Sequence, residues 1–86
     1  MMSASLAATL PGTVDWEKRR WSCSADNHTK YAIDLKGVYF KGDKGKGGHT
    51  QEWIKLNQTV AAGETITIKN QRLTEIEYAR YCFFKY

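Results

Sequence analysis

The clearest strand in this chain is the stretch Tyr31-Ala32-Ile33-Asp34-Leu35-Lys36-Gly37-Val38-Tyr39-Phe40. Apolar and polar side chains alternate through its first half, which is the pattern of a strand with one face on a core. The alternation changes register after Lys36-Gly37, so Val38 and Phe40 become the expected inward pair and Tyr39 points outward. A glycine at such a shift predicts a β-bulge, which inserts one residue and bends the strand.

The same signal recurs along the chain. Thr65 to Asn70 alternates as a half-buried antiparallel strand does. Further strands are predicted at Trp21–Ser24, Glu52–Leu56 and Glu75–Tyr86, with turn signals between them. Asp15–Arg19 fits either a strand or a short helix. We therefore expect an all-β, mainly antiparallel fold, a small β-sandwich or barrel of five to six strands with at most one short N-terminal helix.

The length of 86 residues indicates one domain. Residues 1–12 read as a flexible N-terminal tail or a short first element, closed by the turn signal Pro11-Gly12. Residues 13–86 form the single β-rich domain. Three Trp, five Tyr and three Phe give a composition typical of a folded chain. A domain this small has little core, so a covalent staple or a partner would help to stabilise it.

The last predicted strand is apolar or aromatic on both faces from Tyr78 onward. This favours a central strand covered on both sides, because so aromatic a segment on an open edge would invite aggregation. The alternative is an edge strand through which two copies pair. The oligomeric state is thus a monomer, or a homodimer through the C-terminal strand.

Two cysteines, Cys23 and Cys82, predict a disulfide between the first clear strand and the last. By the loop-entropy model, closing so long a loop contributes about 4 kcal/mol. The alternative is a pair of buried, reduced thiols. The bridge favours secretion, as do two N-x-T triplets, Asn27-His28-Thr29 and Asn57-Gln58-Thr59. No signal peptide is expected in the chain as given, and no run approaches the roughly 20 apolar residues of a membrane span.

Glycine and lysine dominate Lys41-Gly42-Asp43-Lys44-Gly45-Lys46-Gly47-Gly48-His49-Thr50. This stretch lacks the Lys-Ser/Thr ending and the following helix of a phosphate-binding P-loop, and it lacks the flanking helices of a KH loop. We predict a mobile hairpin tip whose binding residues are Lys41, Lys44, Lys46 and His49. The alternative is a solvated loop without a partner.

A second basic patch, Lys18, Arg19 and Arg20, extends the candidate binding set. Tyr39 and Trp53 are the aromatic residues expected to be exposed near the loop. The net charge of +4 favours an anionic partner, with solubility as the alternative explanation. The two basic patches would form one positive surface only if the fold makes them neighbours.

These features predict a small non-enzymatic binding protein, resembling an effector, an inhibitor or a lectin in type. It would present the loop to an anionic, glycan or protein partner. One alternative is a nucleic-acid-binding β-domain, which combines a positive groove with stacking aromatics. Another is a ribonuclease-like or toxin-like enzyme that uses His28 and His49 as acid and base. We predict no cofactor and no metal, because Cys23, His28, His49 and Cys82 lack the short spacings of a zinc site.

Overall fold

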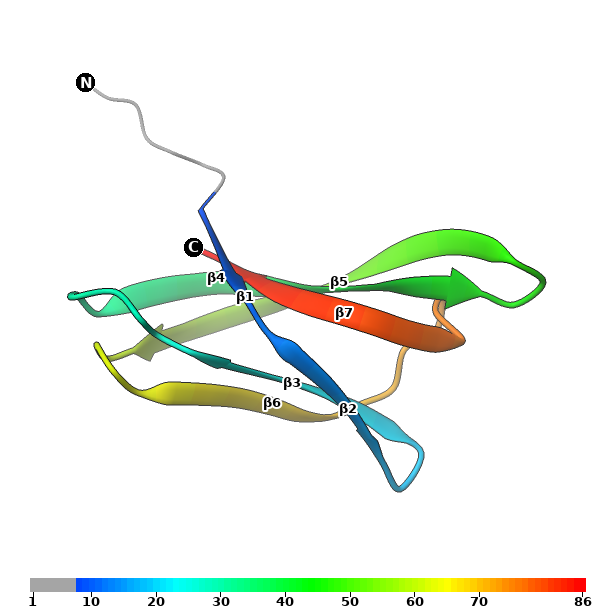
Figure 1. Ribbon diagram of the computed structural model, residues 1–86, viewed down its shortest axis with the longest axis horizontal. Helices are drawn as coiled ribbons and strands as arrows, with labels where there is room; N and C mark the ends of the chain where they lie inside the picture. The colour runs from blue at the N-terminus through cyan, green and yellow to red at the C-terminus, as the bar shows by residue number, and fades with distance from the viewer. Residues whose placement is uncertain (1–7) are drawn as a thin grey trace.

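The computed structural model describes residues 8–86, which fold into two antiparallel sheets packed face to face (Figure 1). Seven strands make up these sheets: β1 (Thr9–Pro11), β2 (Thr13–Glu17), β3 (Arg20–Asp26), β4 (Ile33–Lys44), β5 (Gly48–Val60), β6 (Thr65–Gln71) and β7 (Tyr78–Lys85). The four-stranded sheet has the order β1-β7-β4-β5, and the three-stranded sheet has the order β2-β3-β6. The all-β prediction is confirmed. Within residues 8–86 there is no helix, and so none that could cross a membrane.

The core lies between the sheets and is built from the inward residues of each strand. Val38, Phe40 and Phe84 are fully buried there. The inward pair Val38 and Phe40 is therefore confirmed. So is the bulge, because the pairing of β4 with β5 shifts register between Leu35 and Gly37. Burial of each such side chain contributes about 1.5–3 kcal/mol.

The segment Asp15–Arg19, which fitted either a strand or a short helix, begins within strand β2 (Thr13–Glu17). The short-helix alternative is therefore wrong. β2 pairs with β3 from Thr13 opposite Ser24 to Glu17 opposite Arg20. Tight pairing with β3 outweighs the weak local helix signal, because a short helix has little intrinsic stability without packing.

The chain changes sheets at Gly12. β1 pairs with β7 in the four-stranded sheet, whereas β2 belongs to the other sheet. A Cβ at Gly12 would lie 2.5 Å from Cys23 Sγ and 3.0 Å from Cys82 Sγ, so a side chain would collide with the sulfurs. Strand β1 thus accounts for residues 9–11 of the expected tail or first element, and residues 1–7 lie outside the described residues.

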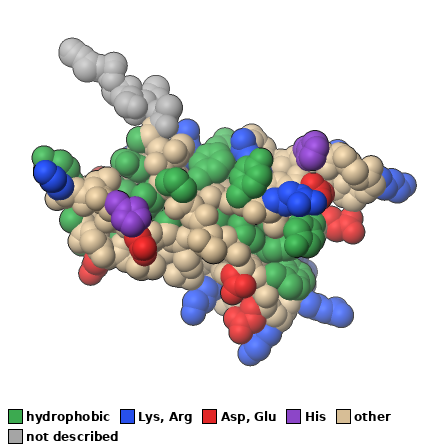
Figure 2. Space-filling view, in the orientation of Figure 1, with side chains coloured by type: hydrophobic (Ala, Val, Ile, Leu, Met, Phe, Trp, Pro, Cys, Tyr) green, Lys and Arg blue, Asp and Glu red, His purple; other side chains and the backbone are tan. Residues whose placement is uncertain are grey.

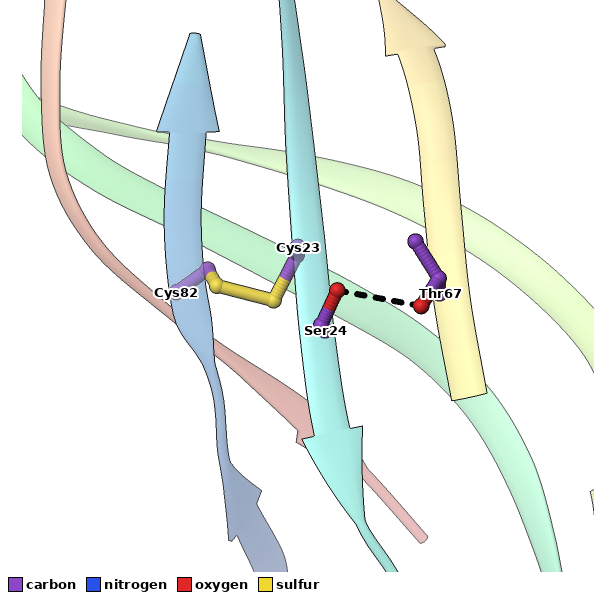
Figure 3. The surroundings of a disulfide bond; sticks show 4 residues. All are labelled: Cys23, Ser24, Thr67 and Cys82. Carbon is purple, nitrogen blue, oxygen red and sulfur yellow. Dashed lines mark hydrogen bonds between the residues drawn. A yellow bond between two sulfur atoms is a disulfide. The ribbon is translucent and has the colours of Figure 1, made fainter. Parts of the chain in front are cut away.

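The predicted disulfide is present and joins the two sheets (Figure 3). Cys23 on β3 and Cys82 on β7 are both buried, with an S–S distance of 2.05 Å. Beside it, the hydroxyl groups of Ser24 and Thr67 share a hydrogen bond of 3.0 Å between β3 and β6. The reduced-thiol alternative is wrong, and a zinc site that uses these thiols is excluded with it.

Strand β7 lies inside its sheet, with β4 on one side and β1 on the other. Central placement is as expected, but the expected cover on both faces is wrong, because Tyr78 and Tyr81 are exposed. A two-layer sandwich covers only the inner face of each strand. β1 pairs with Phe83–Lys85, so this part of β7 is not a free edge, and a homodimer through the C-terminal strand stays a prediction.

The glycine- and lysine-rich stretch is mostly strand. Pairing of β4 with β5 continues to Lys44 opposite Gly48, so only residues 45–47 form the turn. The prediction of a ten-residue mobile tip is therefore wrong. Glycine permits a loop without requiring one, and the backbone ladder continues through Gly42 and Gly48.

The other hairpin tip is a two-residue turn made of Lys18 and Arg19. Both have positive φ, 53° and 65°. Two positive φ values are what a type I′ hairpin turn requires, and Asn-Gly satisfies that requirement better than Lys-Arg. This turn therefore carries two positive charges, and the left-handed backbone of its two residues is strained.

Candidate ligand-binding face

Three aromatic rings form a row across the outer face of the four-stranded sheet. Tyr39 on β4 is paired with Trp53 on β5 and with Phe83 on β7. The ring centroids are 4.7 Å apart for Tyr39 and Trp53, and 5.4 Å apart for Tyr39 and Phe83. These residues face outward because their sequence neighbours Val38, Ile54 and Phe84 face the core.

Trp53 anchors one end of this row. Its indole lies over Gly37, where an added Cβ would come within 2.1 Å of the ring. The ring therefore covers backbone that no side chain shields, and it still leaves 42% of the residue exposed. The predicted exposure of Trp53 is correct, and the half-buried Tyr39 lies beside it.

A shallow depression of about 440 Å³ adjoins the row on the side of the β4–β5 turn. Its lining includes Lys41, His49, Gln51, Arg80 and Tyr81. Lys41 Nζ lies 5.3 Å from the centroid of the Phe83 ring, so the cation and the row are in contact. Such a site offers ammonium, guanidinium, amide and hydroxyl donors to an anionic group.

Arg80 is fixed in this depression by Asp43. The guanidinium donates from Nε at 3.0 Å and from Nη2 at 2.8 Å to Asp43 Oδ2. His49 Nδ1 lies 3.6 Å from Asp43 Oδ1 on the other side. The hydrogen bonds from Arg80 lower the pKa of Asp43, and the same contact raises the pKa of Arg80. A bidentate pair of this kind holds the guanidinium in one orientation.

We expect the Asp43 carboxyl to titrate below its ordinary pKa of 3.8. Its pKa is lower in the folded chain than in the unfolded chain, so the Arg80 contact stabilises the fold above that pH. This contribution is lost as pH falls through the folded pKa. A carbon-detected NMR titration would measure it. In Arg80→Gln the Asp43 pKa should return toward 3.8, and an unchanged value would contradict the role of Arg80.

The structure brings together four of the predicted binding residues: Lys41, His49, Tyr39 and Trp53 share one face. Lys44 and Lys46 lie at the end of the same hairpin. Lys18 and Arg19 lie at the tip of the β2–β3 hairpin, and Arg20 lines a polar depression on the three-stranded sheet. In Figure 1 the two hairpin tips lie at the same end of the molecule and diverge.

The basic groups do not form a single patch. Lys30 lies in the connection between β3 and β4, before the strand that ends with Lys44. Figure 2 shows Lys and Arg side chains spread around the periphery of one face, with hydrophobic side chains gathered between them. The spread of the basic side chains thus favours local contacts with separate anionic groups. It does not favour docking onto one broad anionic partner surface.

The two histidines are far apart. His28 precedes β4, and His49 pairs with Asp43 near the other end of that strand. A strand of this length spans roughly 35–40 Å. A general acid and a general base must both reach one substrate, and this geometry does not place His28 and His49 for that role.

Arg80, Tyr81 and Phe83 belong to this face and were not predicted as binding residues. Phe83 had a signal, because its parity is opposite to that of Cys82 and Phe84. The sequence carries no signal for the position of Arg80, because its partner Asp43 lies 37 residues earlier in the chain.

Comparison with protein families, characterised proteins and solved structures gives no match for this chain. Across the part of the chain that the structure describes, no group of three His, Cys, Asp or Glu side chains lies close enough to hold a metal ion.

Proposed function

We propose that this protein is a non-enzymatic binding protein that takes an acidic glycan on the outer face of its four-stranded sheet. The observation that carries the proposal is the contact between the cationic depression and the aromatic row, where Lys41 lies over Phe83. Sugar rings present flat apolar faces that pack on Trp53 and Tyr39. Sulfate or carboxylate groups on the same chain would accept hydrogen bonds from Lys41 and Arg80.

The outer face of the other sheet lacks the features of a binding site, which supports the choice of the four-stranded sheet as the ligand-binding face. The outer face of the three-stranded sheet carries Ser24 and Thr67, which satisfy one another by a hydrogen bond. Its depression is lined by Asp15, Glu17, Arg20 and Lys69, in which acidic and basic groups balance. Such a face is typical of a solvated surface.

Calorimetric titration with a heparin-derived oligosaccharide at low salt tests the proposal. Lys41→Gln should weaken binding about tenfold, because it removes one charge-assisted contact. Trp53→Leu should weaken binding to a similar degree while keeping an apolar cover over Gly37. An oligosaccharide that is desulfated, N-acetylated and carboxyl-reduced is neutral, and it should bind more weakly than the sulfated one.

The matched control is the double variant Lys18→Asn, Arg19→Gly. It removes two positive charges from the remote β2–β3 turn, and its residues suit the two positive φ values there. Binding should stay within about twofold of the parent. If this variant loses as much affinity as Lys41→Gln, the net charge accounts for binding and the proposed face does not.

A second candidate ligand is single-stranded nucleic acid, which the row of three rings across adjacent strands favours. Bases stack on exposed aromatic side chains beside a cationic track in single-strand-binding domains. Oligo-dT should then bind with a steep salt dependence, since counterions are released. An abasic oligonucleotide keeps the phosphates and lacks the bases. Equal binding of the two oligonucleotides would rule out base stacking on this row.

A further inference from the structure

One of the two N-x-T triplets is displayed on the exposed edge of the sandwich. Asn57, Gln58 and Thr59 lie near the end of β5, and all three are exposed. β5 is the outermost strand of its sheet, so among residues 8–86 it has a strand partner on the β4 side alone. Leu56 and Val60 pack in the core. The period of two therefore directs Asn57 and Thr59 to the outer face.

This triplet has the two groups that attachment of an N-linked oligosaccharide requires, an amide and a hydroxyl two residues later. The hydroxyl of Thr59 donates a hydrogen bond of 2.7 Å to Asp34 Oδ1 on the neighbouring strand. This contact lies on the exposed face of the sheet and not in the core. An oligosaccharide on Asn57 would thus extend from the edge into solvent without displacing a buried group.

The other triplet is a contrast within the same chain. Asn27 is only 1% exposed, and its Nδ2 atom donates to the carbonyl oxygens of Tyr31 and Val60. The nitrogen atom that would carry a sugar is therefore enclosed by the chain. A molecule modified at Asn27 could not bury this side chain, so the fold is compatible with an oligosaccharide at Asn57 alone.

Two further features favour modification at Asn57. The buried Cys23–Cys82 bond is of the kind that persists in oxidising compartments, and acceptor triplets are used in secreted proteins. In addition, β5 is 13 residues long and leaves a row of backbone N–H and C=O groups without a strand on its outer side. Proteins protect such edges with charge, proline or cover. Along Gly48–Val60 there is no proline, and Lys55 is the one Lys, Arg, Asp or Glu residue on the outer face.

We infer that Asn57 carries an N-linked oligosaccharide, which shields the exposed edge of β5. The glycosyl donor is a lipid-linked oligosaccharide diphosphate. Asn57 Nδ2 forms a bond to C1 of the first sugar and loses one proton, while the bond from C1 to the diphosphate oxygen breaks and the lipid diphosphate leaves. A bulky, hydrated group at this position prevents a second chain from pairing along β5.

Peptide mass spectrometry of the full chain, passed through the secretory pathway of a eukaryotic cell behind a cleavable leader, tests this inference. The folded fraction, in which no free thiol reacts, should carry an oligosaccharide at Asn57 and none at Asn27. Peptide N-glycosidase should release it and leave an aspartate at position 57. An unmodified Asn57 in the folded fraction would overturn the inference. A modified Asn27 there would also overturn it, because the fold would then not distinguish the two triplets.

Substitutions identify the acceptor. Asn57→Gln and Thr59→Ala should each abolish the modification, whereas Thr59→Ser keeps the hydroxyl and should keep the modification. Asp34→Ala is the matched control, because it removes the same hydrogen bond as Thr59→Ala and leaves the triplet intact. This variant should stay modified. Persistent modification of Thr59→Ala, or its loss in Asp34→Ala, would contradict the role assigned to the triplet.

Light scattering over a range of protein concentrations tests the shielding of β5. The enzymatically deglycosylated chain and the Asn57→Gln chain should both self-associate at lower concentrations than the glycosylated chain. Identical behaviour of the three would show that the oligosaccharide does not protect this edge. All of these variants keep Lys41 and Trp53, so the proposed binding of an acidic glycan is tested separately.

Discussion

A variant in which Cys23 and Cys82 are both replaced by alanine should lose about 3–4 kcal/mol of unfolding free energy. The bridge spans a sequence separation of 59 residues, so its absence greatly increases the conformational freedom of the unfolded chain. It also joins β3 of one sheet to β7 of the other. A chain of 86 residues has little core with which to offset the loss.

Urea unfolding and thermal scans measure this change. The midpoint temperature should fall by roughly 15–25 °C, since a domain of this size loses about 4–8 °C for each kcal/mol. Reduction of the parent protein should reproduce most of the loss without any substitution, which separates the bond from the alanine side chains. Loss of less than about 1 kcal/mol in both experiments would show that packing alone holds the sheets together.

The second large effect should come from Asn27→Ala, with a loss of about 2–4 kcal/mol. Asn27 is only 1% exposed and is the one buried polar side chain of residues 8–86. Its Nδ2 donates to the carbonyl oxygens of Tyr31 at 2.9 Å, Val60 at 3.1 Å and Ala61 at 3.2 Å. Its Oδ1 accepts from the amide and the hydroxyl of Thr29. Alanine would remove these contacts together, although the carbonyl oxygens of Tyr31 and Ala61 would keep the Thr29 hydroxyl and the Glu64 amide as donors.

Asn57→Ala is the matched control for Asn27→Ala. Asn57 is the asparagine of the other N-x-T triplet and is exposed on β5, so its substitution should change the unfolding free energy by less than about 0.5 kcal/mol. Chemical denaturation of both variants makes the comparison. Similar losses in the two variants would contradict the role of Asn27 in tying the β3–β4 and β5–β6 connections together.

This contrast also separates the two triplets. Asn27-His28-Thr29 is a turn motif in which the asparagine side chain holds its own backbone, as Asx turns do. Only Asn57 presents its amide to solvent. Both triplets match the same N-x-T pattern, and their different roles follow from the burial of Asn27 and the exposure of Asn57.

Local alternation in the sequence determined which residues face the core. Val38 and Phe40, Trp21 and Cys23, and the outward Tyr39 follow from a period of two, which is a property of each strand by itself. The bulge at Gly37 and the all-β class follow from the same local rules. The hairpin tips were harder to place, because glycine and lysine in Lys41–Thr50 suggest a loop while the pairing of β4 with β5 extends through most of it.

Tertiary structure alone decided which strands are neighbours, and therefore where the sites lie. Placing β4 between β5 and β7 brings Asp43 to Arg80 across 37 residues, and aligns Trp53, Tyr39 and Phe83 in one row. The same strand order leaves β5 at the sheet edge, with Asn57 exposed on it. Strands with the same alternation can pair in many orders. The order is set by non-local packing and by the Cys23–Cys82 bond, which a pattern of period two does not specify.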